Sequence, residues 1–291
     1  MVASGLVIGL VTGGIPGFSK EVSQLSLVVA MTFSLTEISY GGIAIRAEFR
    51  GFLKSLASSY GLLSGLLLLF AYLSPDPAIH DGWILMAAVP PAVAVVPITS
   101  YLTGDTRRAL ISLAVLYLLG LFLVPGITIA FTQQSPPIAE LVLQSSLLVG
   151  VPIAASRPMR RWLAVANFRT SAVSVSFFVL VFAIAGSTRE PLLARPDLLA
   201  PLILFAGFRT FGLGTAVFLA ARSLHWSRDD RLAVTTFSSF KNLGLTVVLA
   251  FAMFGAVASL PSIVSLVFEI LWLSALPVLF RRRTVSSSPQ A

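Results

Sequence analysis

The chain has 291 residues, of which 56% are hydrophobic and only 11% are charged, and its mean hydropathy is +0.92. A soluble domain carries about 25% charged residues, so this composition excludes a soluble fold. The absence of cysteine also excludes disulfides, thiolate metal sites and cysteine nucleophiles. We therefore predict an all-α polytopic membrane protein.

A membrane-spanning helix needs about 20 apolar residues, so this chain with short loops has room for about ten. Residues 1–10 lack the basic region of a signal peptide, so the first span is predicted to begin near the initiator methionine. The Ser-rich tail 284–291 is predicted to be disordered. In chain order, the apolar segments predict spans at 2–17, 22–38, 56–73, 83–102, 109–131, 138–155, 170–186, 198–221, 232–256 and 262–280.

Basic residues alternate between rich and poor loops along these spans, as the positive-inside rule requires. The poor loops hold Lys20, Arg189 and Arg195. The rich loops hold fifteen of the 20 basic residues: Arg46, Arg50, Lys54, Arg107, Arg108, Arg157, Arg160, Arg161, Arg169, Arg222, Arg228, Arg231, Arg281, Arg282 and Arg283. Both termini are therefore predicted to be cytoplasmic, in the plasma (inner) membrane. Contact with anionic lipid accounts for the net charge of +8, without nucleic acid as a partner.

Ten spans divide into two five-helix halves, 1–131 and 132–283, and an odd number per half inverts the second half. Inverted repeats are a common plan among transporters. The fourth span of each half is unusual. Segment 88–100 contains Pro90, Pro91 and Pro97, which lack backbone donors, and segment 235–245 is polar at mid-membrane depth. These interruptions predict two broken helices, spans 4 and 9, that line a substrate cavity. The alternative is a proline kink in a packed helix.

Three segments resemble those of the bile acid:sodium symporter family: 89–105 (Val-Pro-Pro-Ala-Val-Ala-Val-Val-Pro-Ile-Thr-Ser-Tyr-Leu-Thr-Gly-Asp), 238–250 (Ser-Ser-Phe-Lys-Asn-Leu-Gly-Leu-Thr-Val-Val-Leu-Ala) and 31–37 (Met-Thr-Phe-Ser-Leu-Thr-Glu). The likeness covers nearly the whole chain and is to the prokaryotic members. It implies a core domain of spans 3–5 and 8–10, a panel domain of spans 1, 2, 6 and 7, and a crossing of spans 4 and 9 near the bilayer centre. Family substrates are mostly organic anions, and many members couple to sodium.

The chain departs from the family pattern where sodium binds. A Ser-Asn pair of the fourth span is replaced by Val95 and Val96, or by Val96 and Pro97. In the ninth span Asn242 matches, but Lys241 stands at a Gln position and Phe237 at a Glu position. A carboxylate is lost and an ammonium gained, so we expect a sodium ion to be repelled from this place.

Three charged residues fall well inside predicted spans, away from their ends, where a basic side chain costs about 2.5–3.5 kcal/mol at the bilayer centre. They are Lys241, Arg209 and Glu269. In one hypothesis Lys241 takes the place of sodium and exchanges a proton during transport. In a second, Arg209 and Lys241 attract an anionic substrate, with Glu37 at the cytoplasmic interface. The alternative is a structural ion pair of Glu269 with Lys241 or Arg209.

Hydrogen-bonding residues near the crossing complete the predicted substrate and ion site. In the second half these are Asn242, Ser238, Ser239 and Thr246, and in the first half Thr99 and Ser100. The alternative for the hydroxyls is a bond back to a helical carbonyl. His80, with Asp76 and Asp81, is predicted to lie in a solvated loop, and no metal or other cofactor is expected.

These patterns predict a secondary active transporter of a small organic anion, working by alternating access, and not an enzyme. Sodium symport is one mode of coupling. The other is a proton-coupled or sodium-independent exporter or uniporter in which Lys241 replaces the sodium ion. A non-transporting membrane sensor or assembly subunit is the alternative of another class. Substrate identity, direction and oligomeric state stay open.

Overall fold

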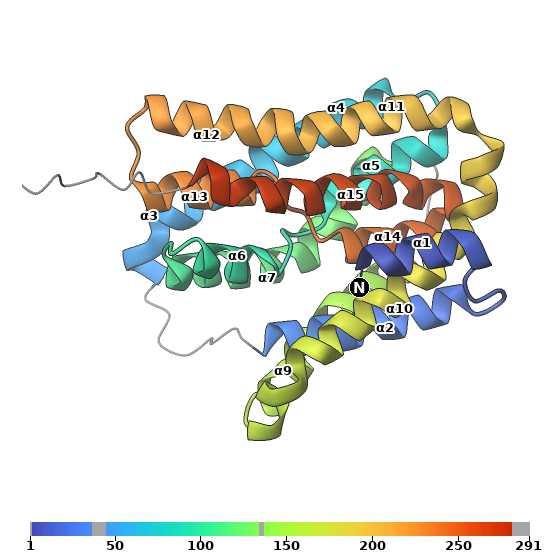
Figure 1. The fold of residues 1–291 in the computed structure, drawn as a ribbon, viewed down its shortest axis with the longest axis horizontal. Coiled ribbons are helices and arrows are strands. Elements are labelled where there is room, and N and C mark those ends of the chain that lie inside the picture. Colours follow the sequence, from blue (N-terminus) through green and yellow to red (C-terminus); the bar gives the residue numbers. More distant parts are fainter. Residues whose placement is uncertain (1, 37–44, 134–136, 281–291) are drawn as a thin grey trace, which may run out of the picture.

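The computed structural model describes residues 2–36, 45–133 and 137–280, and within these ranges it contains helices and no β-strand (Figure 1). The predicted tail and Glu37 lie outside the described residues. Helices long and apolar enough to cross a membrane are Glu48–Leu73, Thr106–Phe131, Ile138–Met159, Asn167–Ala194, Pro196–Ser223 and Ala256–Leu279. They correspond to the predicted spans 3, 5, 6, 7, 8 and 10, so an all-helical, polytopic protein is confirmed.

Three of these long helices contain a π-helical turn. The first is α3 (Ile45–Leu56), η1 (Ala57–Leu63) and α4 (Ser64–Leu73). The second is α8 (Ile138–Ser145), η2 (Ser146–Gly150) and α9 (Val151–Met159). The third is α11 (Pro196–Gly207), η3 (Phe208–Gly212) and α12 (Leu213–Ser223). Such turns are frequent at functional sites, because they interrupt the α-helical hydrogen-bond ladder and redirect side chains.

The helices α1 (Val2–Thr12), α2 (Ser19–Leu35), α9 and α10 (Leu163–Ala194) lie together on one side of the molecule (Figure 1). Glycines bring α1 against α10. A Cβ on Gly9 would lie 3.0 Å from the Cβ of Ala185, and one on Gly5 would lie 2.8 Å from the carbonyl oxygen of Phe178. The two backbones therefore touch, as small residues allow in membrane helices.

Predicted span 4 contains two short helices, α5 (Pro77–Ala88) and α6 (Val95–Tyr101), with a helix break between them, and α7 (Thr106–Phe131) follows. The carboxylate of Asp76 caps the beginning of α5 by accepting from the amides of Ala78 and Ile79 at 3.0 and 3.2 Å. The helix ends because Pro90 forces Val89 into an extended conformation, with φ −68° and ψ 153°.

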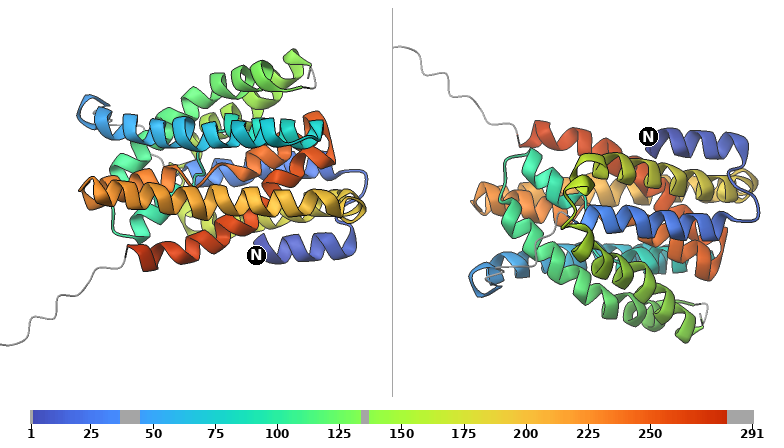
Figure 2. Two further views of the ribbon diagram at one scale, coloured as in Figure 1. Left: turned by 90° about the horizontal axis from the view of Figure 1, so that it is seen from above. Right: turned by 90° about the horizontal axis from the view of Figure 1, so that it is seen from below.

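Predicted span 9 likewise contains two short helices, α13 (Arg228–Phe237) and α14 (Leu243–Phe254), with a helix break between them. Asn242 caps α14, and its Oδ1 accepts from the amide of Leu245 at 3.1 Å. Gly255 then adopts φ +86°, which allows a sharp turn into α15 (Ala256–Leu279). From above and below, the long helices are seen to run roughly along one common direction (Figure 2).

The prediction of a solvated loop at His80 is wrong. His80 and Asp81 lie within α5 and are 8% and 0% exposed. Nδ1 of His80 lies 2.9 Å from Oδ1 of Asp81, which also accepts from the amide of Gln133 at 2.8 Å. The pair is buried because α5 begins six residues before the predicted span at 83 and packs against α4, α7 and α15.

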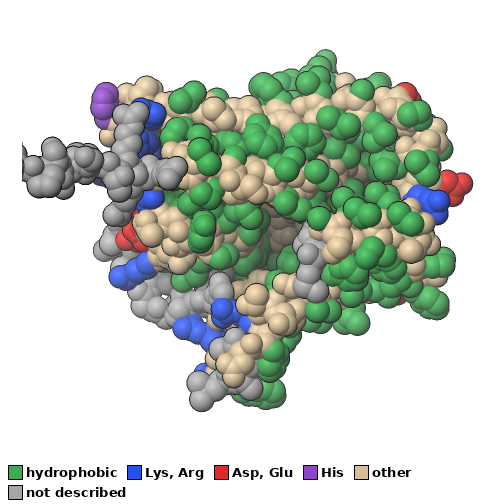
Figure 3. Space-filling view, viewed as in Figure 1, with side chains coloured by type: hydrophobic (Ala, Val, Ile, Leu, Met, Phe, Trp, Pro, Cys, Tyr) green, Lys and Arg blue, Asp and Glu red, His purple; other side chains and the backbone are tan. Residues whose placement is uncertain are grey.

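The outer surface is apolar along most of its length. Large hydrophobic side chains such as Phe122, Val278 and Tyr72 are 77%, 76% and 84% exposed. On the face drawn in Figure 3, green side chains cover the middle, and Lys and Arg side chains gather toward the ends of the bundle. A soluble monomer rarely exposes so continuous an apolar surface, so these helices contact the lipid bilayer.

Candidate functional site: a cavity beside two helix breaks

The two helix breaks contact each other through the backbone. Pro91 and Lys241 form an isolated antiparallel bridge. The amide of Asn242 donates to the carbonyl of Pro90 at 3.0 Å, and the amide of Ala92 donates to the carbonyl of Phe240 at 3.3 Å. Because a proline has no amide hydrogen, Pro90 and Pro91 contact residues 240–242 without leaving a backbone donor unpaired. The breaks therefore supply each other with partners that the helices no longer provide.

The ammonium of Lys241 lies in a closed site made by the first half of the chain. Its Nζ donates to the carbonyl oxygens of Val89 and Ala87 at 2.8 and 3.1 Å and to Oγ of Ser64 at 2.9 Å. It also lies 4.2 Å from the centre of the Tyr60 ring, which η1 positions. Lys241 is wholly buried. The two carbonyls belong to the C-terminal end of α5, where the helix dipole favours a cation.

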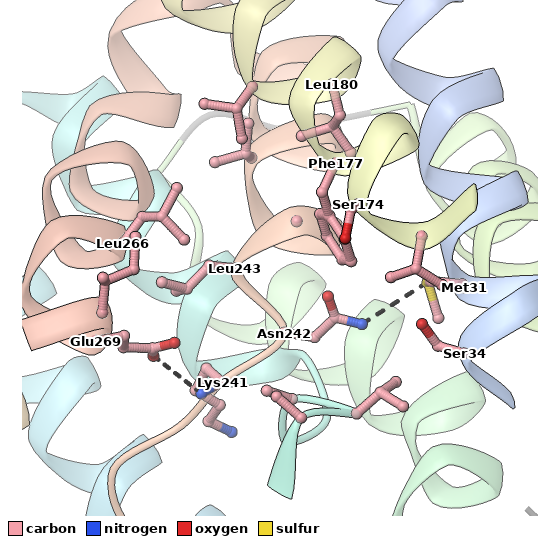
Figure 4. Close-up of a pocket in the computed structure, with 18 of the residues that line it drawn as sticks. Met31, Ser34, Ser174, Phe177, Leu180, Lys241, Asn242, Leu243, Leu266 and Glu269 are labelled. Carbon is pink, nitrogen blue, oxygen red and sulfur yellow. Dashed lines mark hydrogen bonds between the residues drawn. The ribbon is translucent and has the colours of Figure 1, made fainter. Parts of the chain in front are cut away.

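Arg209 and Glu269 form a buried ion pair that joins η3 to α15. Nη2 of Arg209 donates to Oε1 of Glu269, and the same oxygen accepts from the amide of Lys241 at 3.2 Å. Arg209 is wholly buried and Glu269 is 7% exposed. Of the structural alternatives left open by the sequence, the structure contains the Arg209–Glu269 pair. The Lys241 ammonium does not take part, since its side chain points away from Glu269 (Figure 4).

Asn242 lies where the breaks, α2 and α7 meet. Its Nδ2 donates to the hydroxyl of Tyr117 at 2.9 Å and lies 3.7 Å from Sδ of Met31, while its Oδ1 caps α14. Both ends of the amide are thus used in holding the fold. The side chain is 5% exposed and borders the cavity described below.

The remaining predicted hydroxyl groups bond locally, as the alternative interpretation required. Ser238 and Ser239 donate to the carbonyl of Thr235 at 3.1 and 2.7 Å. Thr246 donates to the carbonyl of Asn242 at 3.0 Å, and Thr99 to that of Val95 at 2.7 Å. Their hydrogens are therefore not directed at a ligand.

Two further predicted site residues lie in α6. Pro97 does not break a helix, because it is the third residue of α6, where an amide has no helical acceptor in any case. It borders the cavity described next. Ser100 is exposed on the same short helix.

A cavity of about 430 Å³ lies beside the crossing, between α14 and α15 on one side and α2 and α10 on the other. Figure 4 shows side chains of these helices pointing into it. Four predicted residues border it, namely Pro97, Lys241, Asn242 and Glu269. Its volume lies within the range of roughly 300–1,000 Å³ that is usual for small-molecule sites.

The sequence predictions missed the α10 side of the cavity. Arg169, Thr170 and Ser174 line it there, together with apolar residues such as Val173 and Phe177. Arg169 was interpreted only as a loop residue that sets orientation. The sequence feature that indicates this side is the pair Thr170 and Ser174. These two hydroxyl residues are four positions apart, and a helix places such residues on one face.

The polar groups of the cavity have opposite character. Leu243 and Gly244 border it in the first turn of α14, so the positive end of that helix dipole faces the space. Glu269 borders it with its carboxyl group. The side chains of Lys241 and Arg209 are wholly buried beside it, so any attraction that they exert on an anion in the cavity acts without direct exposure of their charges.

Long apolar helices with an exposed apolar surface define a multi-pass membrane protein. A family model, that of the SBF-like CPA transporters, matches residues 21–282, and the chain belongs to this bile acid:sodium symporter-like family. It is therefore a membrane transporter with a small-molecule substrate, and not an enzyme. A comparison with curated proteins gives no match.

Proposed function

We propose that the chain is a secondary active transporter that carries a small organic anion by alternating access, and that the cavity beside the crossing is its substrate site. The observation that carries the proposal is the position of this cavity at the junction of two helix breaks, with the N-terminus of α14 facing it. In transporters with discontinuous helices, such N-termini point at anionic substrate groups.

The proposed movement is between two groups of helices. One group, α1, α2, α10 and the long helix of α8, η2 and α9, forms the panel, and the other helices form the core that contains both breaks. The cavity is bordered by helices of both groups, so a rocking of one against the other opens it to either side in turn. The two inverted five-helix repeats, the plasma membrane and the cytoplasmic termini belong to the same proposal.

For the coupling ion, the geometry favours sodium-independent transport over sodium symport. Lys241 places its amino group among two carbonyl oxygens and one hydroxyl oxygen, which are the ligand types that a sodium ion uses. The ammonium fills this set of oxygens from within the chain. A sodium ion at the same place would meet a charge of its own sign.

The test is a melting-temperature screen of the purified chain against organic anions of increasing size, from methanesulfonate to taurocholate, with sodium and with choline as the counter-ion. We expect at least one anion to stabilise the chain equally in both salts. Anions that stabilise it only with sodium would favour sodium symport. A second measurement is flux of the same anion across the membrane of reconstituted vesicles. Binding without flux would favour a membrane sensor.

A matched pair of variants on α10 locates the site. Val173 borders the cavity, whereas Val175, two residues further on, is 49% exposed on the outer surface. Val173→Trp fills the cavity, and we expect it to weaken anion binding at least tenfold. Val175→Trp places the same side chain outside and is expected to leave binding unchanged. Equal effects of both variants would place the substrate elsewhere.

A further inference from the structure

Glu269 presents one free oxygen to the cavity. Both of its hydrogen bonds, from Nη2 of Arg209 and from the amide of Lys241, go to Oε1. Neither of these hydrogen bonds reaches Oε2, and the side chain borders the cavity. Figure 4 shows the carboxylate directed at this space. Oε2 of Glu269 is therefore a hydrogen-bond acceptor at the cavity to which neither of these groups donates.

Lys241 is not a comparable proton site. An ammonium has three hydrogens, and all three are donated, to Val89, Ala87 and Ser64. Loss of a proton would remove one of these bonds from a wholly buried group. The only other buried carboxylate of the described residues is Asp81, which is bonded to His80 and Gln133. Glu269 is thus the acid that solute in the cavity meets.

We propose that Glu269 binds the coupling proton on Oε2, and that the resulting carboxylic acid donates this hydrogen to the anionic group of the transported substrate. The proton comes from water in the cavity and returns to water on the other side of the membrane, so no bond other than O–H forms or breaks. Oε1 keeps both of its hydrogen bonds in either state, because a neutral carboxyl still accepts at its carbonyl oxygen. The ion-pair geometry with Arg209 therefore does not have to open.

The charges around the cavity make proton and anion binding mutually dependent. With Glu269 ionised, its charge balances Arg209 and repels an anion. With Glu269 protonated, Arg209 is left with an uncompensated positive charge, and its Nε and Nη1 have no hydrogen-bond partner among the described residues. An incoming anion restores neutrality. By linkage, the anion must strengthen proton binding as much as the proton strengthens anion binding. This inference rests on the proposed function, in which the substrate is an anion.

The charged groups near Glu269 come from three elements. Arg209 approaches from η3, Lys241 contributes its amide from the break before α14, and Arg169 borders the same cavity from α10. On α5, His80 and Asp81 lie beside Gly82, which packs against Ala258 in the first turn of α15, eleven residues before Glu269. The nearest described charges are thus positive, and a proton on Glu269 changes the balance that an anion experiences.

The proton site is tested directly by infrared difference spectra of the full chain in detergent, titrated between about pH 4 and about pH 9. We expect the carbonyl band of a buried, protonated carboxyl to appear as the pH falls. The band should be absent in Glu269→Gln and unchanged in Asp81→Asn, the matched buried acid outside the cavity. The absence of such a band in the parent, or its persistence in Glu269→Gln, overturns the proposal. Should Glu269→Gln fail to fold, loss of the band in Asp81→Asn overturns it equally.

The link to the anion is tested with taurocholate, whose sulfonate stays ionised across this range. We expect its affinity to fall about tenfold for each pH unit above the midpoint of the infrared titration, and to be independent of pH in Glu269→Gln. Taurocholate that binds the parent with the same affinity at every pH overturns the coupling. If taurocholate fails to bind at any pH, the anion proposal is weakened, while the infrared titration still decides the proton site.

Discussion

The ammonium of Lys241 lies 2.8 Å from the carbonyl oxygen of Val89, so a side chain from the second half of the chain caps a broken helix of the first. The contact is polar and wholly buried, and its two partners are separated by 152 residues in the sequence. It accounts for why a lysine is stable in an apolar bundle, because each of its hydrogens has an acceptor and the end of a helix dipole lies beside it.

Replacement of Lys241 by Met is expected to lower the free energy of unfolding by about 1–3 kcal/mol, because the carbonyl of Val89 loses its donor, whereas that of Ala87 keeps a hydrogen bond from Oγ of Ser64 at 2.6 Å. The thioether fills a similar volume but donates nothing to Val89 and Ala87. Thermal unfolding in detergent measures the change. Lys20→Met is the control, since Lys20 is 39% exposed and pairs with Glu140 only at 3.8 Å. Equal melting temperatures of the two variants would contradict a structural role for the ammonium.

The ion pair of Arg209 and Glu269 is expected to be strongly cooperative. Arg209→Met alone leaves a buried carboxylate without its cation, at a cost of about 3–5 kcal/mol. Glu269→Met leaves the opposite charge. The double variant has neither and is expected to be clearly more stable than the sum of the single losses predicts. A thermodynamic cycle from denaturant unfolding measures this coupling, and strict additivity would argue against a direct pair.

The contact between α1 and α10 is expected to exclude even one methyl group. A Cβ on Gly186 would overlap the backbone of Gly13 and Gly14. Gly186→Ala is therefore predicted to destabilise the chain by about 1–3 kcal/mol, although alanine favours a helix. Gly126→Ala is the matched control, because a Cβ there meets no atom within 4 Å. We expect it to be neutral or stabilising by up to about 1 kcal/mol, as measured by melting temperature.

Asp230 is expected to make the stability of one end of the bundle depend on acid. Partial burial alone would raise its pKa, but a hydrogen bond from Lys54 at 2.7 Å and the charge of Arg108 lower the pKa below its usual 3.8. The group therefore stabilises the fold fully above about pH 4 and progressively less as the pH falls through its lowered pKa. Asp230→Asn should flatten this acid limb of the melting-temperature profile. Asp229→Asn, which removes a carboxylate without an ion pair among the described residues, should leave it in place.

The long apolar helices were predictable because hydropathy is a sum over about twenty residues, which single polar side chains do not change. Their ends were not. The span predicted at 170–186 is part of α10, Leu163–Ala194, since backbone hydrogen bonds continue past the apolar stretch through Arg189. The start of α5 was missed for another reason. His80 and Asp81 satisfy each other, and a polar pair that does so is buried at a place where either residue alone indicates solvent.

At the site, residue types were predictable but their partners were not. The sequence places Arg209, Lys241 and Glu269 at similar depth and leaves the pairing open. The choice depends on π-helical turns, which direct Arg209 at Glu269 and the Tyr60 ring at Lys241, and these turns have no simple periodic signal. The hydroxyl groups of Ser238, Ser239 and Thr246 differ from ligand-binding ones only in rotamer, which composition does not reveal.

The capping of α5 by Lys241 has a consequence for the biosynthesis of the protein. The ribosome completes α5 long before it reaches position 241, so the carbonyl of Val89 enters the membrane without the donor that it has in the finished protein. Until the second half arrives, this part of the nascent chain needs water, lipid headgroups or an insertion factor to satisfy it. The end of α5 therefore reaches its final packing only after the segment that carries Lys241 has been synthesised.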